Sequence, residues 1–383
     1  MANRYFVNGG VDNNWGTTGN WSTTSGGAGG SAVPLATDDV FFDASSPPCT
    51  VNTSARVALT LNCTGYTNTI TMSQQITVSG SVTLVAAMTI AASGALLVNG
   101  NSTLTSNGKA WPNAMTLSGT SITHALADSW VIGGLLTLGS GTVTITINSA
   151  NPAHRLTAQA GLTIGGSGPI ILGTTKILLD GTGTLTGSSS AGSLRNDLDF
   201  KSGTITISGG FDYQSGTLTN TGATVVTTGS TLAIAATTTL DCPNITWHNV
   251  SLTGSSTITL NNKLLVGGLL TLGNASGSLT VNGDIEVSGG VTTGTSGITG
   301  GTGTVKLIAT QTVTRSQTGI FSKSIEIDAP GGTITFSGTC EFQVGTLLVT
   351  DVSTILTDAG TWLAFGGGGS SRPSHPLFQQ VID

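Results

Sequence analysis

Short segments in which threonine alternates with a branched apolar residue constrain the fold of this chain more than any other feature. The segment Thr142–Ile147 reads Thr-Val-Thr-Ile-Thr-Ile. Successive side chains of a β-strand point to opposite faces, so the threonines of this segment share one face and the apolar residues share the other. The alternation therefore predicts a half-buried strand.

The same alternation returns at Gly203–Ile207, Thr257–Leu260 and Gly332–Phe336, each followed closely by Gly, Ser or Asn. Gly and Asn tolerate positive φ, so they turn the chain cheaply after each short strand. Charged residues make up only 8% of the chain, against about 25% in typical globular domains. Val, Ile and Leu nevertheless recur throughout, which argues against disorder. We expect a folded, all-β protein.

Strand-like segments also repeat at preferred spacings, and such repetition is typical of stacked structural units. Gly203–Thr206 is echoed at Gly216–Thr219 and Gly229–Leu232, in steps of 13 residues. Ile76–Gly80 is echoed at Leu96–Gly100, a step of 20 residues. These steps predict an elongated parallel β-helix or β-solenoid with irregular rungs. Tandem antiparallel β-sandwiches, which also use short alternating strands, are the alternative.

A longer echo links Gly133–Gly139 to Gly267–Gly273, 134 residues later. It suggests a duplicated block around 131-145 and 265-281.

The two ends of the chain differ from its middle, which predicts three parts: a capping or anchoring segment at 1-45, a solenoid body at 46-364, and a Gly-rich linker with an extended tail at 365-383. The tail could dock on a partner subunit in the way that extended peptides add to sheet edges. Its docking candidates are Arg372, Pro373, Pro376, Leu377 and Phe378.

The first segment carries a recognisable pattern: Asn14–Gly16, then Gly19–Ser22, a Gly/Ser run, and Pro34–Asp43. It resembles the opening of repetitive β-solenoid proteins, both bacteriophage structural proteins and bacterial surface proteins of the autotransporter-associated type. The first rung of a solenoid exposes core and an unpaired edge, so an aromatic-rich cap is expected there. The capping or anchoring candidates are Trp15, Trp21, Phe41 and Phe42.

The resemblance implies a virion structural protein: a bacteriophage fibre, appendage or capsid-decorating subunit that contacts other virion proteins, forms homotrimers and meets host surface glycans. The N-terminus, MANRYFVNGG, has no basic stretch followed by an apolar core. We therefore predict no secretory signal peptide, which favours the virion over the bacterial cell surface. A tailspike-like enzyme that degrades polysaccharide and a bacterial surface adhesin are the alternative functions.

Charge and hydropathy exclude two classes of partner. The net charge of −6 is spread along the chain without clusters of Lys and Arg, so we expect no nucleic acid. The longest apolar stretch, Leu84–Val98, is interrupted by Thr89, Ser93 and Gly94. It is shorter than the roughly 20 residues that a membrane helix needs, so we expect no membrane insertion.

Paired carboxylates are the features that could support catalysis. Asp197 and Asp199 lie two positions apart, near Arg195. On a strand they would share a face about 7 Å apart, close to the separations used in glycoside hydrolysis. Two further pairs, Asp284 with Glu286 and Glu326 with Asp328, have the same spacing. The simpler interpretation is that these carboxylates are solvated on a strand face. We therefore predict that the chain is not an enzyme.

The acidic residues, histidines and cysteines are the remaining candidates for metal or thiol chemistry. Asp38, Asp39 and Asp43 form an acidic cluster that could bind calcium in a loop, although hydrogen bonding to local backbone is commoner. The histidines, His124, His154, His248 and His375, have no partner at metal-ligand spacing. No cofactor is predicted.

Cys49 and Cys63 could form a bridge, but scattered buried thiols fit the four cysteines better.

Overall fold

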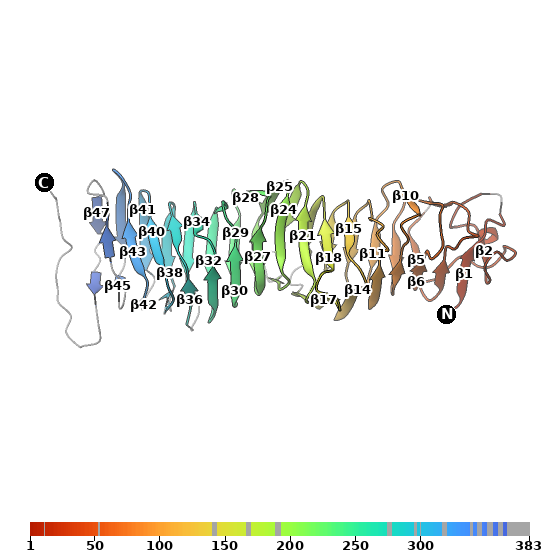
Figure 1. Cartoon of the computed structure of the whole chain (residues 1–383), viewed down its shortest axis with the longest axis horizontal. Coiled ribbons are helices and arrows are strands. Elements are labelled where there is room, and N and C mark those ends of the chain that lie inside the picture. Colours follow the sequence, from red (N-terminus) through yellow and green to blue (C-terminus); the bar gives the residue numbers. More distant parts are fainter. Residues whose placement is uncertain are drawn as a thin grey trace. The chain divides into compact units, whose positions relative to one another are not determined.

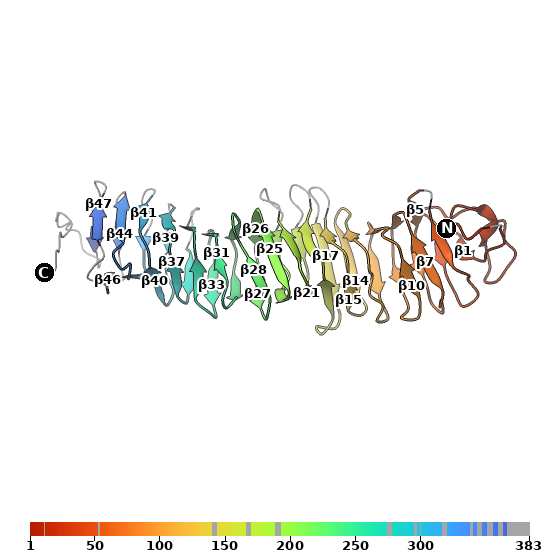
Figure 2. The same cartoon turned by 90° about the horizontal axis from the view of Figure 1, so that it is seen from above.

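The computed structural model describes residues 1–365 apart from 11, 53, 140–143, 166–169, 188–192, 274–277, 295–296, 299, 316–319, 338–339, 343–346, 351–354 and 359–362. The chain divides into two compact units, Met1–Thr206 and Ile207–Asp383. Each unit is a parallel β-solenoid, in which every turn of the chain contributes strands to several sheets (Figures 1 and 2). The predicted fold class is therefore confirmed. The alternative of antiparallel sandwiches is wrong.

Unit 1 contains four parallel sheets, which we name 1A to 1D. Sheet 1A consists of β1 (Asn3–Phe6), β3 (Asp39–Phe41), β6 (Thr60–Asn62), β9 (Val82–Thr83), β12 (Ser102–Thr105), β14 (Ile122–Leu126), β17 (Thr144–Ser149), β20 (Ile170–Leu172) and β23 (Ser193–Leu194). Sheet 1B consists of β5 (Arg56–Ala58), β8 (Ile76–Val78), β11 (Leu96–Val98), β13 (Met115–Leu117), β16 (Leu136–Leu138), β19 (Gly161–Ile164) and β22 (Gly183–Thr186). Sheet 1C consists of β4 (Cys49–Val51), β7 (Thr69–Met72) and β10 (Thr89–Ala91), and sheet 1D of β15 (Trp130–Ile132), β18 (Arg155–Ala158), β21 (Lys176–Asp180) and β24 (Leu198–Ser202).

Unit 2 also contains four parallel sheets, 2A to 2D. Sheet 2A consists of β26 (Gly210–Tyr213), β29 (Thr231–Ile234), β32 (Asn249–Leu252), β35 (Leu269–Leu272), β38 (Gly290–Thr293), β41 (Gln311–Arg315), β44 (Thr333–Ser337) and β47 (Ile355–Asp358). Sheet 2B consists of β27 (Gly216–Asn220), β30 (Thr238–Asp241), β33 (Thr257–Leu260) and β36 (Thr280–Asn282), and sheet 2C of β31 (Thr246–Trp247), β34 (Leu264–Val266), β37 (Ile285–Val287), β40 (Thr304–Leu307), β43 (Ser324–Ile327) and β46 (Leu347–Val349). Sheet 2D consists of β39 (Gly297–Ile298), β42 (Ile320–Phe321), β45 (Cys340–Phe342) and β48 (Leu363–Phe365). Of the other three strands, β2 (Trp21–Ser22) pairs antiparallel with β1, β25 (Thr204–Ser208) spans the division between the units and β28 (Thr224–Val226) lies in unit 2.

The core of each unit is built from the inward face of these short strands. A three-residue strand such as β8 buries its first and last side chains and turns the middle one outward, so Ile76 and Val78 are buried while Thr77 is only half-buried. Of the predicted strand Thr142–Ile147, Thr142 and Val143 lie outside the described residues, and the rest follows the same rule in β17, where Ile145 and Ile147 are buried. Stacked turns therefore place apolar rows inside and threonine rows outside.

The length of one turn can be read from the strand register. Leu96 pairs with Ile76, 20 residues earlier, which confirms the predicted 20-residue step. Ile171 pairs with Ile145 across 26 residues, so turns vary in length as predicted. The 13-residue step is not a turn.

The 13-residue step connects strands that belong to two different sheets of the solenoid. Strand β27 (Gly216–Asn220) belongs to sheet 2B, whereas β29 (Thr231–Ile234) belongs to sheet 2A. Each side of a turn consists of an alternating strand and a small-residue corner. Similar segments therefore recur along the chain before a full turn is complete.

The 134-residue echo corresponds to two corners of the same construction. Gly133–Gly134 joins β15 to β16, and Gly267–Gly268 joins β34 to β35. At Gly134 a Cβ atom would lie 2.4 Å from the amide nitrogen of Ala114, and at Gly268 it would lie 2.3 Å from the carbonyl oxygen of His248. The second glycine of each pair is required because the chain approaches the previous turn closely.

The N-terminal segment lies over the first strands of unit 1 (Figure 1). The strand β2 (Trp21–Ser22), which follows the 3₁₀ turn Thr18–Asn20, pairs antiparallel with β1 and covers the edge of sheet 1A. The amide of Trp15 donates to the carbonyl of Thr50 (2.8 Å), and the amide of Thr50 donates to the carbonyl of Asn13 (2.7 Å), so the edge of β4 is also paired. An unpaired sheet edge can associate with strands of other chains. The N-terminal segment covers two such edges, that of sheet 1A at β1 and that of sheet 1C at β4.

Aromatic side chains hold the N-terminal segment in place. Trp15, Trp21 and Phe42 are all fully buried. The two tryptophan rings meet edge to face at 5.1 Å, and the indole N–H of Trp21 donates to the carbonyl of Trp15 (2.7 Å). Phe41 points the other way, because it is the neighbour of Phe42 along the chain, and it stacks on Tyr5 at 4.7 Å. Three of the four predicted capping residues therefore lie inside, and Phe41 lies on the outer face.

A polar network centred on Asp12 stabilises the loop from Asp12 to Asn20, which contains Trp15. The carboxylate of Asp12 accepts hydrogen bonds from the Asn14 amide and side chain, from the Thr17 hydroxyl and from the Asn20 side chain, at 2.7–3.0 Å. The bond from the Asn14 backbone is the largest of the causes that lower the pKa of Asp12. The network fixes the loop that carries Trp15.

We predict that Trp21→Ala lowers the free energy of unfolding of unit 1 by about 3–5 kcal/mol, because it opens a cavity at the covered edge. Urea unfolding followed by circular dichroism measures the effect. Leu35→Ala is the control, since Leu35 is 61% exposed, and it should change stability by less than about 0.5 kcal/mol. Equal effects of the two substitutions would contradict a capping role.

Candidate functional site

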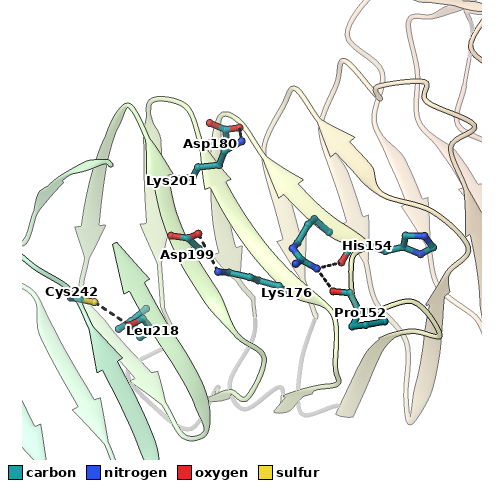
Figure 3. Close-up of polar contacts among 9 residues, drawn as sticks. Pro152, His154, Lys176, Asp180, Asp199, Lys201, Leu218 and Cys242 are labelled. Carbon is teal, nitrogen blue, oxygen red and sulfur yellow. Dashed lines mark hydrogen bonds and ion pairs between the residues drawn. The ribbon is translucent and has the colours of Figure 1, made fainter. Parts of the chain in front are cut away.

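The predicted carboxylate pair lies on the outer face of sheet 1D, but its two members occupy different environments. Asp197 precedes β24 and is exposed, whereas Asp199 lies within β24 and is only 5% exposed. Lys176 on the neighbouring turn forms an ion pair with Asp199, with 3.2 Å between Nζ and Oδ2 (Figure 3). The charge of Asp199 is therefore balanced by a lysine from the adjacent strand.

A second ion pair lies farther along the same strands. Lys201 Nζ is 2.8 Å from Asp180 Oδ2, and the hydroxyl of Ser202 donates to Asp180 Oδ1 at 2.7 Å (Figure 3). The hydrogen bond from Lys201, followed by that from Ser202, lowers the pKa of Asp180. Both pairs join β21 to β24, so the charged groups of this face connect successive turns.

This geometry does not provide the two free carboxylates of a glycoside hydrolase. A general acid and a nucleophile or base must flank one glycosidic bond, whereas Asp199 is held by Lys176. The outward side chains of β18, β21 and β24 include no aromatic ring that could stack on a sugar. The outer face of sheet 1D is best described as an ion-paired surface.

A loop beside this face brings together a serine and a histidine that sequence spacing did not reveal. The side chains of Ser149 and His154 are 2.8 Å apart, between Oγ and Nδ1. The Ser149 hydroxyl also donates to the carbonyl of Leu126 (3.0 Å). Its single hydrogen lies in that bond, so Nδ1–H of His154 donates to Ser149. A serine nucleophile needs the opposite arrangement, with the hydroxyl donating to a basic nitrogen.

Backbone contacts show what this loop does. Arg155 donates to the carbonyls of Pro152 and His154, the latter at 2.9 Å (Figure 3). The amide of Ala153 donates to the Asn151 side chain at 2.9 Å. Carbonyl groups of the loop therefore accept hydrogen bonds from the loop's own residues. The Ser149–His154 contact likewise stabilises the loop.

The acidic cluster proposed for calcium is not assembled by the fold. Asp38 turns inward and accepts from the amides of Ala2 and Leu35 and from Arg4. Asp39, the next residue, turns outward and accepts from the Thr60 hydroxyl at 2.6 Å.

Asp43 contacts the amide of Ser45 (2.9 Å) and the hydroxyl of Ser46 (3.3 Å). The three carboxylates therefore bind separate donors. Among the described residues there is no group of three or more His, Cys, Asp or Glu side chains placed to hold a metal ion.

The cysteines are buried thiols where the structure describes them. Cys49, Cys63 and Cys242 are buried, and Cys49 and Cys63 are not bridged to each other. Burial raises the pKa of Cys63 to about 12 and that of Cys49 well above its usual value, so both are protonated at neutral pH. Cys242 Sγ contacts the carbonyl of Leu218 at 3.3 Å (Figure 3). The side chain of Cys340 lies outside what the structure describes, as do the tail residues Arg372, Pro373, Pro376, Leu377 and Phe378.

Comparisons with known proteins do not assign a function: no family model, no curated protein and no solved structure matches this chain. In the part of the chain that the structure describes, no helix is long and apolar enough to cross a membrane.

We predict that Lys176→Met lowers the free energy of unfolding by roughly 2 kcal/mol, because it leaves the buried carboxylate of Asp199 without its ion-pair partner. Replacing both residues, in Lys176→Met with Asp199→Leu, should recover part of that loss. Asp197→Asn is the matched control and should have little effect, because Asp197 is exposed. A double-mutant cycle measures the coupling, and zero coupling would contradict a structural ion pair.

A second prediction concerns His124, which is fully buried in β14 and lies 2.7 Å from the Ser102 hydroxyl. Burial lowers the pKa of His124 from 6.5 to about 4. Between these values the unfolded chain binds a proton that the folded chain does not. Stability should therefore fall as pH decreases from 6.5 to 4, by about 3 kcal/mol in total.

Urea unfolding across this pH range tests the prediction. His124→Leu should be less stable at pH 7, because Ser102 loses its partner, and should show a flatter pH dependence than the unmodified chain. His248→Ala, at an exposed position, should keep the original slope. The same slope in the His124→Leu variant would rule out His124 as the source.

Proposed function

We propose that this chain is a structural protein of a bacteriophage particle, a fibre, appendage or capsid-decorating subunit located in the virion. The observation that carries the proposal is a stack of parallel turns whose first edges are covered by a segment rich in buried aromatic residues. That same segment carries the sequence resemblance to phage solenoid proteins. The proposed role is mechanical.

The physical basis of the role is the bonding between turns. Each strand of a sheet pairs with the strand of the next turn, as β14 pairs with β17 over five residue pairs. Ion pairs add to this bonding on the outside, since Lys306 on β40 contacts both Glu326 and Asp328 at 2.9 and 2.7 Å. Deforming such a stack breaks many bonds at once, and stiffness is what a projecting part of a particle requires.

Other virion proteins are the proposed partners, and copies of the chain are proposed to assemble as trimers, as the resemblance implies. Host surface glycans are proposed as the outer contact. The proposal assigns no catalytic step to the chain. The ion pairing of Asp199 with Lys176 supports this choice over the tailspike-like alternative.

We predict that particles purified by density gradient contain this protein in a fixed copy number, measured by quantitative mass spectrometry against the major capsid protein. A labelled antibody should mark one class of position on the particles in electron micrographs. Loss of the protein from particles during purification, while other structural proteins remain, would overturn the proposal.

An enzymatic assay separates the alternative function from the proposed one. The purified chain is incubated with host capsular polysaccharide, and released oligosaccharides are measured by chromatography. No release is expected. Release that disappears in an Asp197→Asn variant would replace the mechanical proposal with that of a depolymerase.

A further inference from the structure

Sheet 2B changes to sheet 2D at one place in unit 2, and the regular ladder is interrupted there. After β36 (Thr280–Asn282) the next turn returns as an isolated bridge between Gly300 and Thr280. The chain still contacts the previous turn: the amide of Val281 donates to the carbonyl of Gly300 (3.1 Å), and that of Gly283 to the carbonyl of Thr302 (3.0 Å). Carbonyl groups buried at such an interruption need other donors.

Lys323 supplies those donors. It lies on the turn that follows the one containing Gly300 and Thr302. Its ammonium nitrogen lies 2.9 Å from the carbonyl oxygen of Val281, 2.8 Å from that of Gly283 and 2.5 Å from that of Thr302. A lysine ammonium has three N–H donors and no acceptor, so the three carbonyl groups match its full capacity. The residue is only 1% exposed and is one of the largest fully buried side chains.

The backbone around the three carbonyl groups is packed closely enough to hold them in place. Gly301 has φ +115°, and a Cβ atom there would lie 2.0 Å from the carbonyl oxygen of Val281. Gly303 has φ +87°, and its Cβ would lie 2.3 Å from that of Gly283. Both positions require glycine, because the left-handed conformation and the close approach both exclude a side chain.

Electrostatics keeps the amine charged at neutral pH. Burial lowers the pKa of Lys323 to about 8, and the charge of Asp284 acts in the opposite direction. Asp284 is held nearby by the amide of Thr304, which donates to its Oδ1 at 2.9 Å. At pH 7 the group is therefore mainly ammonium, the form with three donors.

We infer that the carbonyl groups of Val281, Gly283 and Thr302 form a binding site for a monovalent cation, which Lys323 fills with its own tethered ammonium group. A ring of carbonyl oxygens can replace the hydration shell of such an ion. The site would accept a small primary ammonium ion, or potassium, once the lysine side chain is shortened. A bound ion would join the two turns that carry these carbonyl groups, and Lys323 also links them to its own turn.

The test uses the full chain with Lys323→Ala, which removes the ammonium group and opens space for a free ion. Urea unfolding is measured at pH 7 and equal ionic strength with ethylammonium, potassium or tetramethylammonium chloride. The variant should unfold at a lower midpoint than the unmodified chain in tetramethylammonium, which has no N–H donor. Ethylammonium should restore most of the lost midpoint, and the unmodified chain should not respond.

Two control variants separate binding at the site from general salt effects. Lys323→Met fills the space without a charge, so ethylammonium should not restore its midpoint. Lys263→Ala removes a half-exposed lysine that pairs with Glu286 at 2.7 Å, and its midpoint should be the same in all three salts. An unchanged midpoint in Lys323→Ala, or equal recovery with tetramethylammonium, would overturn the inference.

A measurement on the unmodified chain covers the case in which the variants do not fold. In a ¹⁵N-lysine sample at pH 7, one ammonium signal should exchange its protons with water far more slowly than the others, as a buried and fully bonded group does. If every lysine ammonium signal exchanges as fast as that of free lysine, the tethered cation does not exist.

Discussion

Hydrogen bonding from each turn to the next is the interaction on which the rest of this structure depends. Buried N–H and C=O groups must find partners, and in a parallel solenoid the partners lie one turn away in the chain. Sheet 1B shows the result, with seven strands from β5 to β22 paired in register. Because the backbone carries this bonding, the strands need only an inward apolar row. The outward row needs few charges, which explains a chain that is 8% charged.

The same dependence makes every end and interruption of a sheet a problem that side chains must solve. At the start of unit 1 the solution is a covering segment with β2, Trp15 and Trp21. In the middle of unit 2 it is Lys323, which bonds to carbonyl groups of two earlier turns. One solution is apolar and the other is ionic, yet both serve backbone groups at places where the regular pairing of strands stops.

The repeating part of the fold could be predicted from the sequence, because it depends on a local period. Alternation identified strands such as β17, and the 20-residue step gave the true stacking of Ile76 on Leu96. The 13-residue step was misleading, since it compares different sides of a turn. The opposite directions of Asp38 and Asp39 follow from the same alternation, although the acidic cluster suggested one site.

Contacts between turns of unequal length could not be predicted in this way. Lys176 meets Asp199, and Ser102 meets His124, only because of the register that the intervening corners produce. The position of Lys323 depends on where one sheet replaces another, which no local pattern marks. Residues that act across turns therefore need the register, whereas residues that act within a strand do not.

The pairing of Leu96 with Ile76 has a consequence for how such a chain can change. Residues 76–95 form one complete turn, and Ile76 itself pairs with Arg56 in the turn before. Deleting that stretch would bring Leu96 opposite Arg56 with every inward position still facing inward. The stack would be shorter by one strand spacing, about 4.8 Å. Its length is therefore adjustable in whole turns, and recombination within the coding sequence can lengthen or shorten it without redesigning the core.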